Sequence, residues 1–113
     1  MLKLSMPRGD IRNIKFTISD TSGVIMEPFD EVYFTCKRGF TQQNFIFQKK
    51  LSDDTIVFDT EGYYHLVIES ADTSDLTYGE YVFDIEVVDG ASLKQTTVGQ
   101  LKITEEATFL SNE

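Results

Sequence analysis

The clearest indication of the fold of this chain is the segment Asp72–Val88, DTSDLTYGEYVFDIEVV. Its second half alternates strictly between an apolar and a more polar parity. The apolar parity consists of Tyr81, Phe83, Ile85 and Val87, and the other parity consists of Val82, Asp84, Glu86 and Val88. Because successive side chains of a strand point to opposite faces, this pattern predicts a strand that covers a core with one face only. Such strands are typical of antiparallel sheets.

A polar corner precedes this strand. The residues around Asp72 and Asp75 can hydrogen-bond their own backbone, and Gly79 gives the chain freedom where the corner meets the strand. Tyr81 stands two residues before Phe83, which resembles the tyrosine corner of immunoglobulin-like domains with Phe83 in place of the cysteine. The resemblance implies that the Tyr81 hydroxyl bonds back to the preceding loop. We therefore predict a structural corner, a packing device, formed by Leu76, Gly79, Tyr81 and Phe83.

The rest of the chain contains several shorter alternating segments. We predict strands over residues 14–19, 32–37, 45–50, 56–58, 63–68 and about 93–103, with a short extended piece at 24–26. Asp89 and Gly90 predict a tight two-residue hairpin turn, and a slip in parity across Gly99 predicts a bulge. With no helical period beyond one turn near Asp72, the pattern predicts an immunoglobulin-like antiparallel β-sandwich of about seven strands. A small closed β-barrel is the alternative.

The 113 residues are enough for one domain. Pro7 and Gly9 interrupt regular structure, so we expect residues 1–9 to be an N-terminal arm and residues 10–104 to form the sandwich. Residues 105–113 are expected to be an acidic C-terminal tail that is either frayed or used to reach a neighbour. The tripeptide at residues 8–10 spells the integrin-binding sequence Arg-Gly-Asp, but three residues recur easily by chance, so it predicts no recognition.

Composition restricts the partners. Ten basic and 19 acidic residues give a net charge of -9, whereas nucleic acids and anionic lipid surfaces select basic proteins. The N-terminus lacks the apolar run of a signal peptide, and no stretch approaches the ~20 apolar residues of a membrane span. We therefore expect a soluble protein that binds neither nucleic acid nor membrane. The single cysteine, Cys36, shares its parity with Val32 and Phe34 and is expected to be a buried small hydrophobe.

The sequence offers little for catalysis or metal binding. His65 is the only histidine and is predicted to face outward; no triad pattern surrounds it, and zinc needs more ligands than one His and one Cys. The loop acids lack the spacing of a calcium loop, so turn capping is the better interpretation, with calcium a weak alternative. These acids are Asp53 with Asp54, Asp59 with Glu61, and Asp72 with Asp75. We predict no enzymatic activity, no catalytic residue, no metal site and no cofactor.

The order of short motifs along residues 8–105 resembles the N-terminal β-sandwich of phage baseplate upper proteins and related tail or neck domains. The resembling segments are residues 8–18, 20–23, 72–76, 79–85 and 98–103. The resemblance implies a non-enzymatic structural or assembly component of a tailed phage or prophage virion. Its expected partners are other virion proteins, with homo-oligomers possible, and its expected location is the virion, or the host bacterial cytoplasm during assembly. Baseplate upper proteins continue into long trimerising regions, so this sequence predicts an adaptor or decoration piece.

Two other function classes remain open at this point. A carbohydrate- or cell-surface-binding module is suggested by Tyr33, Tyr63 and Tyr78, which could stand in for the Trp of a sugar-stacking platform. A small hydrolase that uses a pair of acids is suggested only by their abundance, and a chain of this size has little room for the deep cleft that glycoside hydrolysis needs.

Overall fold

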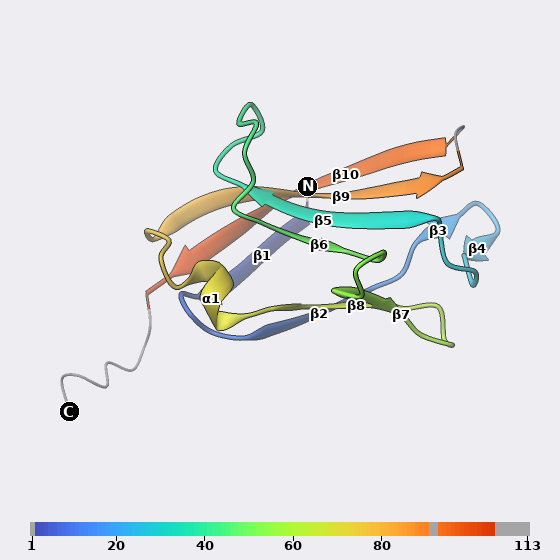
Figure 1. Cartoon of the computed structure of the whole chain (residues 1–113), viewed down its shortest axis with the longest axis horizontal. Coiled ribbons are helices and arrows are strands. Elements are labelled where there is room, and N and C mark those ends of the chain that lie inside the picture. Colours follow the sequence, from blue (N-terminus) through green and yellow to red (C-terminus); the bar gives the residue numbers. More distant parts are fainter. Residues whose placement is uncertain (1, 91–92, 106–113) are drawn as a thin grey trace.

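The computed structural model describes residues 2–90 and 93–105. Two sheets stack face to face, so the predicted β-sandwich is confirmed (Figure 1). The elements are β1 (Leu2–Pro7), β2 (Arg12–Phe16), β3 (Ser19–Asp20), β4 (Gly23–Val24), β5 (Glu31–Lys37), β6 (Phe47–Lys50), β7 (Ile56–Phe58), β8 (Tyr64–Ile68), α1 (Ser70–Thr73), β9 (Gly79–Asp89) and β10 (Leu93–Thr104).

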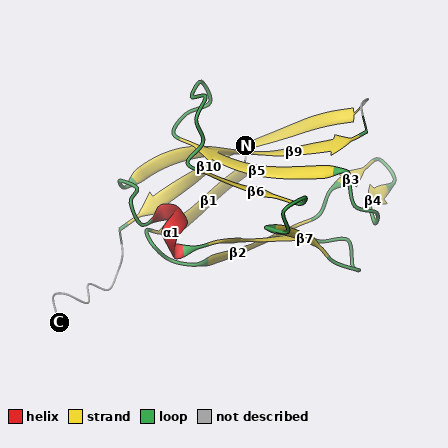
Figure 2. Cartoon of the chain, viewed as in Figure 1, coloured by secondary structure: helices red, strands yellow, loops and turns green. Residues whose placement is uncertain are grey.

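The larger sheet has the order β1-β10-β9-β5-β6, and the smaller sheet has the order β2-β8-β7. This arrangement matches the GFCC′ and BED sheets of immunoglobulin-like sandwiches, with β9 as strand F. The short pair β3–β4 forms a separate two-stranded ribbon. Within the described ranges α1 is the one helix, a single turn between β8 and β9 (Figure 2). No helix in this part of the chain is long and apolar enough to cross a membrane.

The predicted N-terminal arm is wrong, because residues 2–7 form an edge strand. β1 pairs with β10 in parallel, with Leu2 opposite Gly99 and Pro7 opposite Thr104, so the larger sheet is not wholly antiparallel. The Arg8 backbone N–H donates to the Thr104 carbonyl at 3.0 Å. Since backbone groups alternate sides along a strand, Pro7 faces away from β10, and its missing N–H removes no ladder bond.

The apolar parity of β9 lies in the core, as the sequence predicts. Tyr81, Phe83 and Val87 are buried, and the Phe83 ring stacks on Phe34 of β5 with 4.9 Å between ring centroids. Cys36 is fully buried on the same inner face of β5. These contacts place a stacked aromatic pair where antibody domains place a disulfide and a Trp.

The predicted bulge at Gly99 is wrong, because the β9–β10 register is continuous from Gly79 to Asp89. Val98 lies on the outer face, and Gly99 lies on the inner face directly opposite Phe83. A Cβ atom added to Gly99 would lie 2.3 Å from Cζ of Phe83. The apolar parity is interrupted in the sequence because glycine occupies an inner position of β10, and the Phe83 ring fills the space where its side chain would lie.

The β9–β10 hairpin is one residue longer than a two-residue turn. Asp89 is not in the turn but forms the last ladder pair, with Leu93. Gly90 has a φ of +65°, the left-handed conformation that glycine favours. Residues 91 and 92 lie outside the described residues.

Candidate functional site

The structural corner before β9 has the hydrogen bond that the resemblance implies. The Tyr81 hydroxyl donates to the Thr77 carbonyl at 2.8 Å and lies 3.0 Å from the Thr77 hydroxyl. Leu76 and Phe83 are buried beside it, and Gly79 has a φ of +140° at the start of the strand. All four corner residues therefore serve packing and chain direction.

The Arg-Gly-Asp tripeptide packs against this corner. The Arg8 guanidinium lies 4.5 Å from the centre of the Tyr78 ring and donates to the Leu76 carbonyl at 3.5 Å. The Gly9 backbone N–H donates to the Thr73 hydroxyl at 2.9 Å. These contacts give the first two residues of the tripeptide a structural role in joining β1 to the corner.

The loop acids mostly cap turns. Asp53 accepts from the Thr55 backbone N–H at 3.1 Å. Asp72 accepts from the Glu69 backbone N–H, and its carboxylate lies 2.8 Å from Lys49 Nζ. Within the described part of the chain, no three His, Cys, Asp or Glu side chains are grouped to hold a metal ion.

His65 and Cys36 lie on different sheets and face different ways. His65 Nε2 lies 2.6 Å from Asp59 Oδ2 on the outer side of the smaller sheet. This contact, together with the backbone N–H groups of Tyr63 and Glu61, lowers the pKa of Asp59. Burial raises the pKa of the Cys36 thiol to about 12, and the charge of Asp72 adds to the shift. Cys36 is therefore no nucleophile at neutral pH, and the two residues form no dyad.

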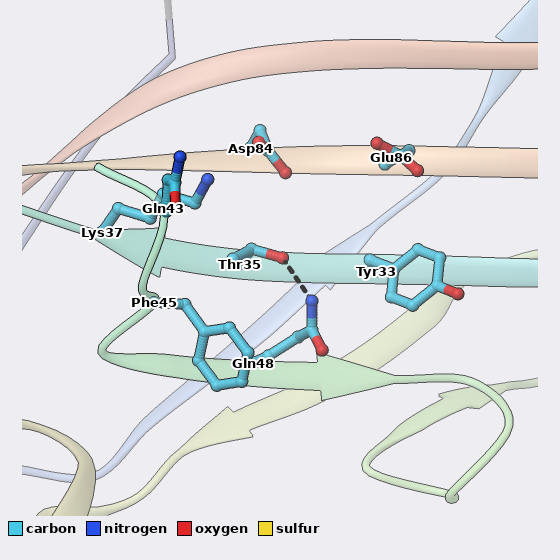
Figure 3. A pocket seen from close by; sticks show the side chains of 8 residues that line it. All are labelled: Tyr33, Thr35, Lys37, Gln43, Phe45, Gln48, Asp84 and Glu86. Carbon is cyan, nitrogen blue, oxygen red and sulfur yellow. Dashed lines mark hydrogen bonds between the residues drawn. The ribbon is translucent and has the colours of Figure 1, made fainter. Parts of the chain in front are cut away.

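A hollow of about 280 Å³ lies on the outer face of the larger sheet, and we name it the outer-face hollow (Figure 3). β5, β6 and β9 form its floor, and the loop over residues 38–46 borders it. Its lining residues are Tyr33, Thr35, Lys37, Gln43, Phe45, Gln48, Asp84 and Glu86.

The sheet register brings these side chains together. Thr35 pairs with Asp84 and Tyr33 pairs with Glu86, so two carboxylates lie directly across from a hydroxyl and a phenol. Gln48 donates from its amide nitrogen to the Thr35 hydroxyl at 3.0 Å. The result is a polar surface with aromatic rings from Tyr33 and Phe45, which suits a ligand that carries hydroxyl groups.

The three tyrosines proposed as a sugar platform do not share one surface. Tyr33 lines the outer-face hollow. The Tyr63 ring lies under Lys15 Nζ at 4.1 Å, beside the smaller sheet, and the Tyr78 ring lies under Arg8 at the corner. Only Tyr33 therefore remains a candidate for ligand contact at this hollow.

A second feature, which we name the edge cleft, lies between the two sheets beside β1 and β10. It consists of two adjoining hollows of about 230 and 210 Å³ that share Leu2, Phe16 and Ile85. The other lining residues are Lys3, Leu4, Ile14, Lys15, Thr17, Ile18, Ser19, Phe34, Phe83, Val87, Gln95 and Thr97. The lining is thus mainly apolar, and its charged members among the described residues are two lysines.

The backbone edge of β10 is open beside this cleft. β1 begins opposite Gly99, so in the described ranges residues 93–98 of β10 pair with β9 only. The backbone carbonyl of Thr104 points toward β1, where it accepts from Arg8. Because backbone groups alternate sides along a strand, every second residue back along β10, including Thr96, directs its backbone groups to that same side. The backbone N–H and C=O of Thr96 therefore point to the open edge.

The sequence matches no protein-family model, and no curated protein is significantly similar to it.

Proposed function

We propose that this protein is a non-enzymatic structural or assembly component of a tailed phage or prophage virion. It acts as a baseplate, tail or neck adaptor or decoration that docks to other virion proteins. The observation that carries the proposal is the open edge of β10 beside the edge cleft. Extended segments of partner proteins bind such edges by adding a strand, with backbone hydrogen bonds for affinity and side-chain pockets for specificity.

The other edges of the larger sheet carry features that block strand pairing at particular positions, and no such feature is seen along residues 94–98 of β10 in the described part of the chain. On β6, the Thr55 hydroxyl accepts from the Lys50 backbone N–H at 2.7 Å and donates to the Lys50 carbonyl. On β1, Pro7 offers no N–H, and Arg12 donates to the Ser5 carbonyl. Such devices keep sheet edges from pairing with other chains. A stretch of edge without such a feature supports a docking role there.

The test is the composition of the particle. Virions released from a strain that encodes the chain would be purified, and the protein would be sought by mass spectrometry and immunogold labelling. We expect it at a fixed copy number and at one location on the tail, neck or baseplate. Deletion of the gene is expected to yield particles that lack this density. Particles purified from the undeleted strain that do not contain the protein would refute the proposal.

A second candidate function is carbohydrate or cell-surface binding at the outer-face hollow. The observation that favours it is the meeting of Tyr33, Phe45 and the two β9 carboxylates in one hollow. A glycan array, probed with and without calcium, tests it. Binding is expected to fall in Tyr33→Ala and Phe45→Ala, while Val67→Ala, exposed on the other sheet, serves as the control. No binding in either condition would eliminate this function.

A further inference from the structure

We propose that residues 106–113 of one copy bind the edge cleft of a second copy as an added strand beside residues 94–98 of β10. The inference rests on the proposed assembly role and adds the binding site and its occupant. It makes the protein self-associate head to tail, because the tail and the cleft are different surfaces.

Backbone geometry provides the first argument. Residues 94, 96 and 98 direct their N–H and C=O groups to the open edge, by the same alternation that directs Thr104 to Arg8. Gln95 and Thr97 have inward parity but are exposed, since the smaller sheet does not cover them. An added strand would continue the line of β1 and cover both the backbone groups and these side chains.

Charge provides the second argument. The protein has 19 acidic residues, yet none of them is among the described lining residues of the cleft. Lys3 and Lys15 contribute to the lining, but both have outward parity, and Lys15 Nζ lies over the Tyr63 ring. Residues 105–113, EEATFLSNE, have three glutamates and no basic residue. In a chain of net charge -9, a cleft without described acids repels an acidic segment less than most of the protein's own surface does.

Apolar matching provides the third argument. Phe109 and Leu110 are adjacent in the segment, so in an extended conformation they project to opposite faces. Phe109 would enter the cleft among Phe16, Ile18 and Ile85, which are half-buried. Leu110 would then lie on the outer face near Val98, an exposed apolar side chain. Both apolar side chains of the segment would thus lose contact with water.

The length of the segment indicates that it binds the cleft of a different copy. Glu105 follows the end of β10, and Val98 lies seven positions back, about 23 Å at ~3.3 Å per residue. β1 occupies the edge along this whole distance. Residues 106–113 span at most about 29 Å when fully extended, so little of the segment would remain to cover residues 94–98 of the same copy.

The test uses the full chain and sedimentation velocity over a concentration series. We expect concentration-dependent oligomers for the wild type. Thr96→Pro removes an N–H that faces the open edge and no bond to β9, so it is expected to fold and to weaken association at least ten-fold. Thr96→Ala keeps the N–H and is the matched control that should associate like the wild type. Phe109→Ser removes the apolar anchor of the segment and should also weaken association at least ten-fold.

Mixing identifies the two surfaces. Thr96→Pro keeps an intact tail and Phe109→Ser keeps an intact cleft, so their mixture should form one-to-one dimers and nothing larger. Edge-to-edge pairing of two β10 strands would instead leave Phe109→Ser fully associated, which would overturn the inference. A wild type that stays monomeric, and a labelled peptide of residues 105–113 that does not bind it, would also overturn it. Neither result bears on whether the protein is found in virions, which the particle analysis decides separately.

Discussion

Substitution of Gly99 by alanine distinguishes the effect of local strand preference from the effect of tertiary packing. The two effects predict changes of opposite sign in the free energy of unfolding. Gly99 lies inside β10 and its φ is not in the left-handed region. By local preference alone, alanine would stabilise the strand by about 0.5–1 kcal/mol, since glycine loses more conformational entropy on folding. The structure predicts destabilisation instead.

The predicted magnitude comes from the atoms that the new methyl group would meet. A Cβ atom at Gly99 would lie 2.3 Å and 2.6 Å from two Phe83 ring atoms and 2.9 Å from the Leu2 carbonyl oxygen. The Phe83 ring is 1% exposed and stacked on Phe34, so moving it away from a methyl group at Gly99 would disrupt this stacking. Overpacking of this kind costs about 1–3 kcal/mol. After the local gain is subtracted, a cost in the middle of this range lowers the free energy of unfolding of Gly99→Ala by about 1 kcal/mol, and a cost at its upper end lowers it by about 2.5 kcal/mol.

Urea unfolding followed by far-UV circular dichroism measures this change. Gly39→Ala is the matched control, since a Cβ atom there meets nothing within 4 Å, and it should be neutral or slightly stabilising. Phe83→Leu should relieve the clash, so the double variant with Gly99→Ala should cost about 1 kcal/mol less than the sum of the single changes. A Gly99→Ala protein as stable as the wild type, or additive costs in the double variant, would refute this account of the β9–β10 packing.

Three further predictions concern single side chains. Tyr81→Phe removes the hydroxyl that bonds to Thr77 and should lower the free energy of unfolding by about 1 kcal/mol in urea melts; an unchanged midpoint would mean that the corner bond contributes nothing. Cys36, whose pKa is raised to about 12 by burial, should react with a thiol reagent at pH 8 only after unfolding, and fast labelling of the native protein would contradict this. The lowered pKa of Asp59 beside His65 stabilises the fold above the ordinary carboxyl pKa, and this stabilisation is lost as the pH falls through the folded pKa. Asp59→Asn should therefore differ most from the wild type near neutral pH and converge with it in acid, as followed by thermal unfolding over a pH series.

The features that depend on neighbours along the chain could be predicted from the amino-acid sequence. Alternation fixed which face of β9 enters the core, and the same parity argument buried Cys36. The corner before β9 was also predictable, since Thr77 and Tyr81 are four residues apart. These features follow from the two-residue period of a strand and from short-range hydrogen bonds, which a single sequence records directly.

The features that depend on strand partners far apart in sequence could not be predicted and are visible in the folded protein alone. Leu2 pairs with Gly99, which turns the expected arm into an edge strand and leaves the rest of the β10 edge open. Tyr33 and Glu86 meet in the outer-face hollow across the β5–β9 pair. Periodicity tells which way a side chain faces but not which strand lies beside it. That choice is made by the packing of the whole sandwich, and so both candidate binding surfaces appear only in the folded protein.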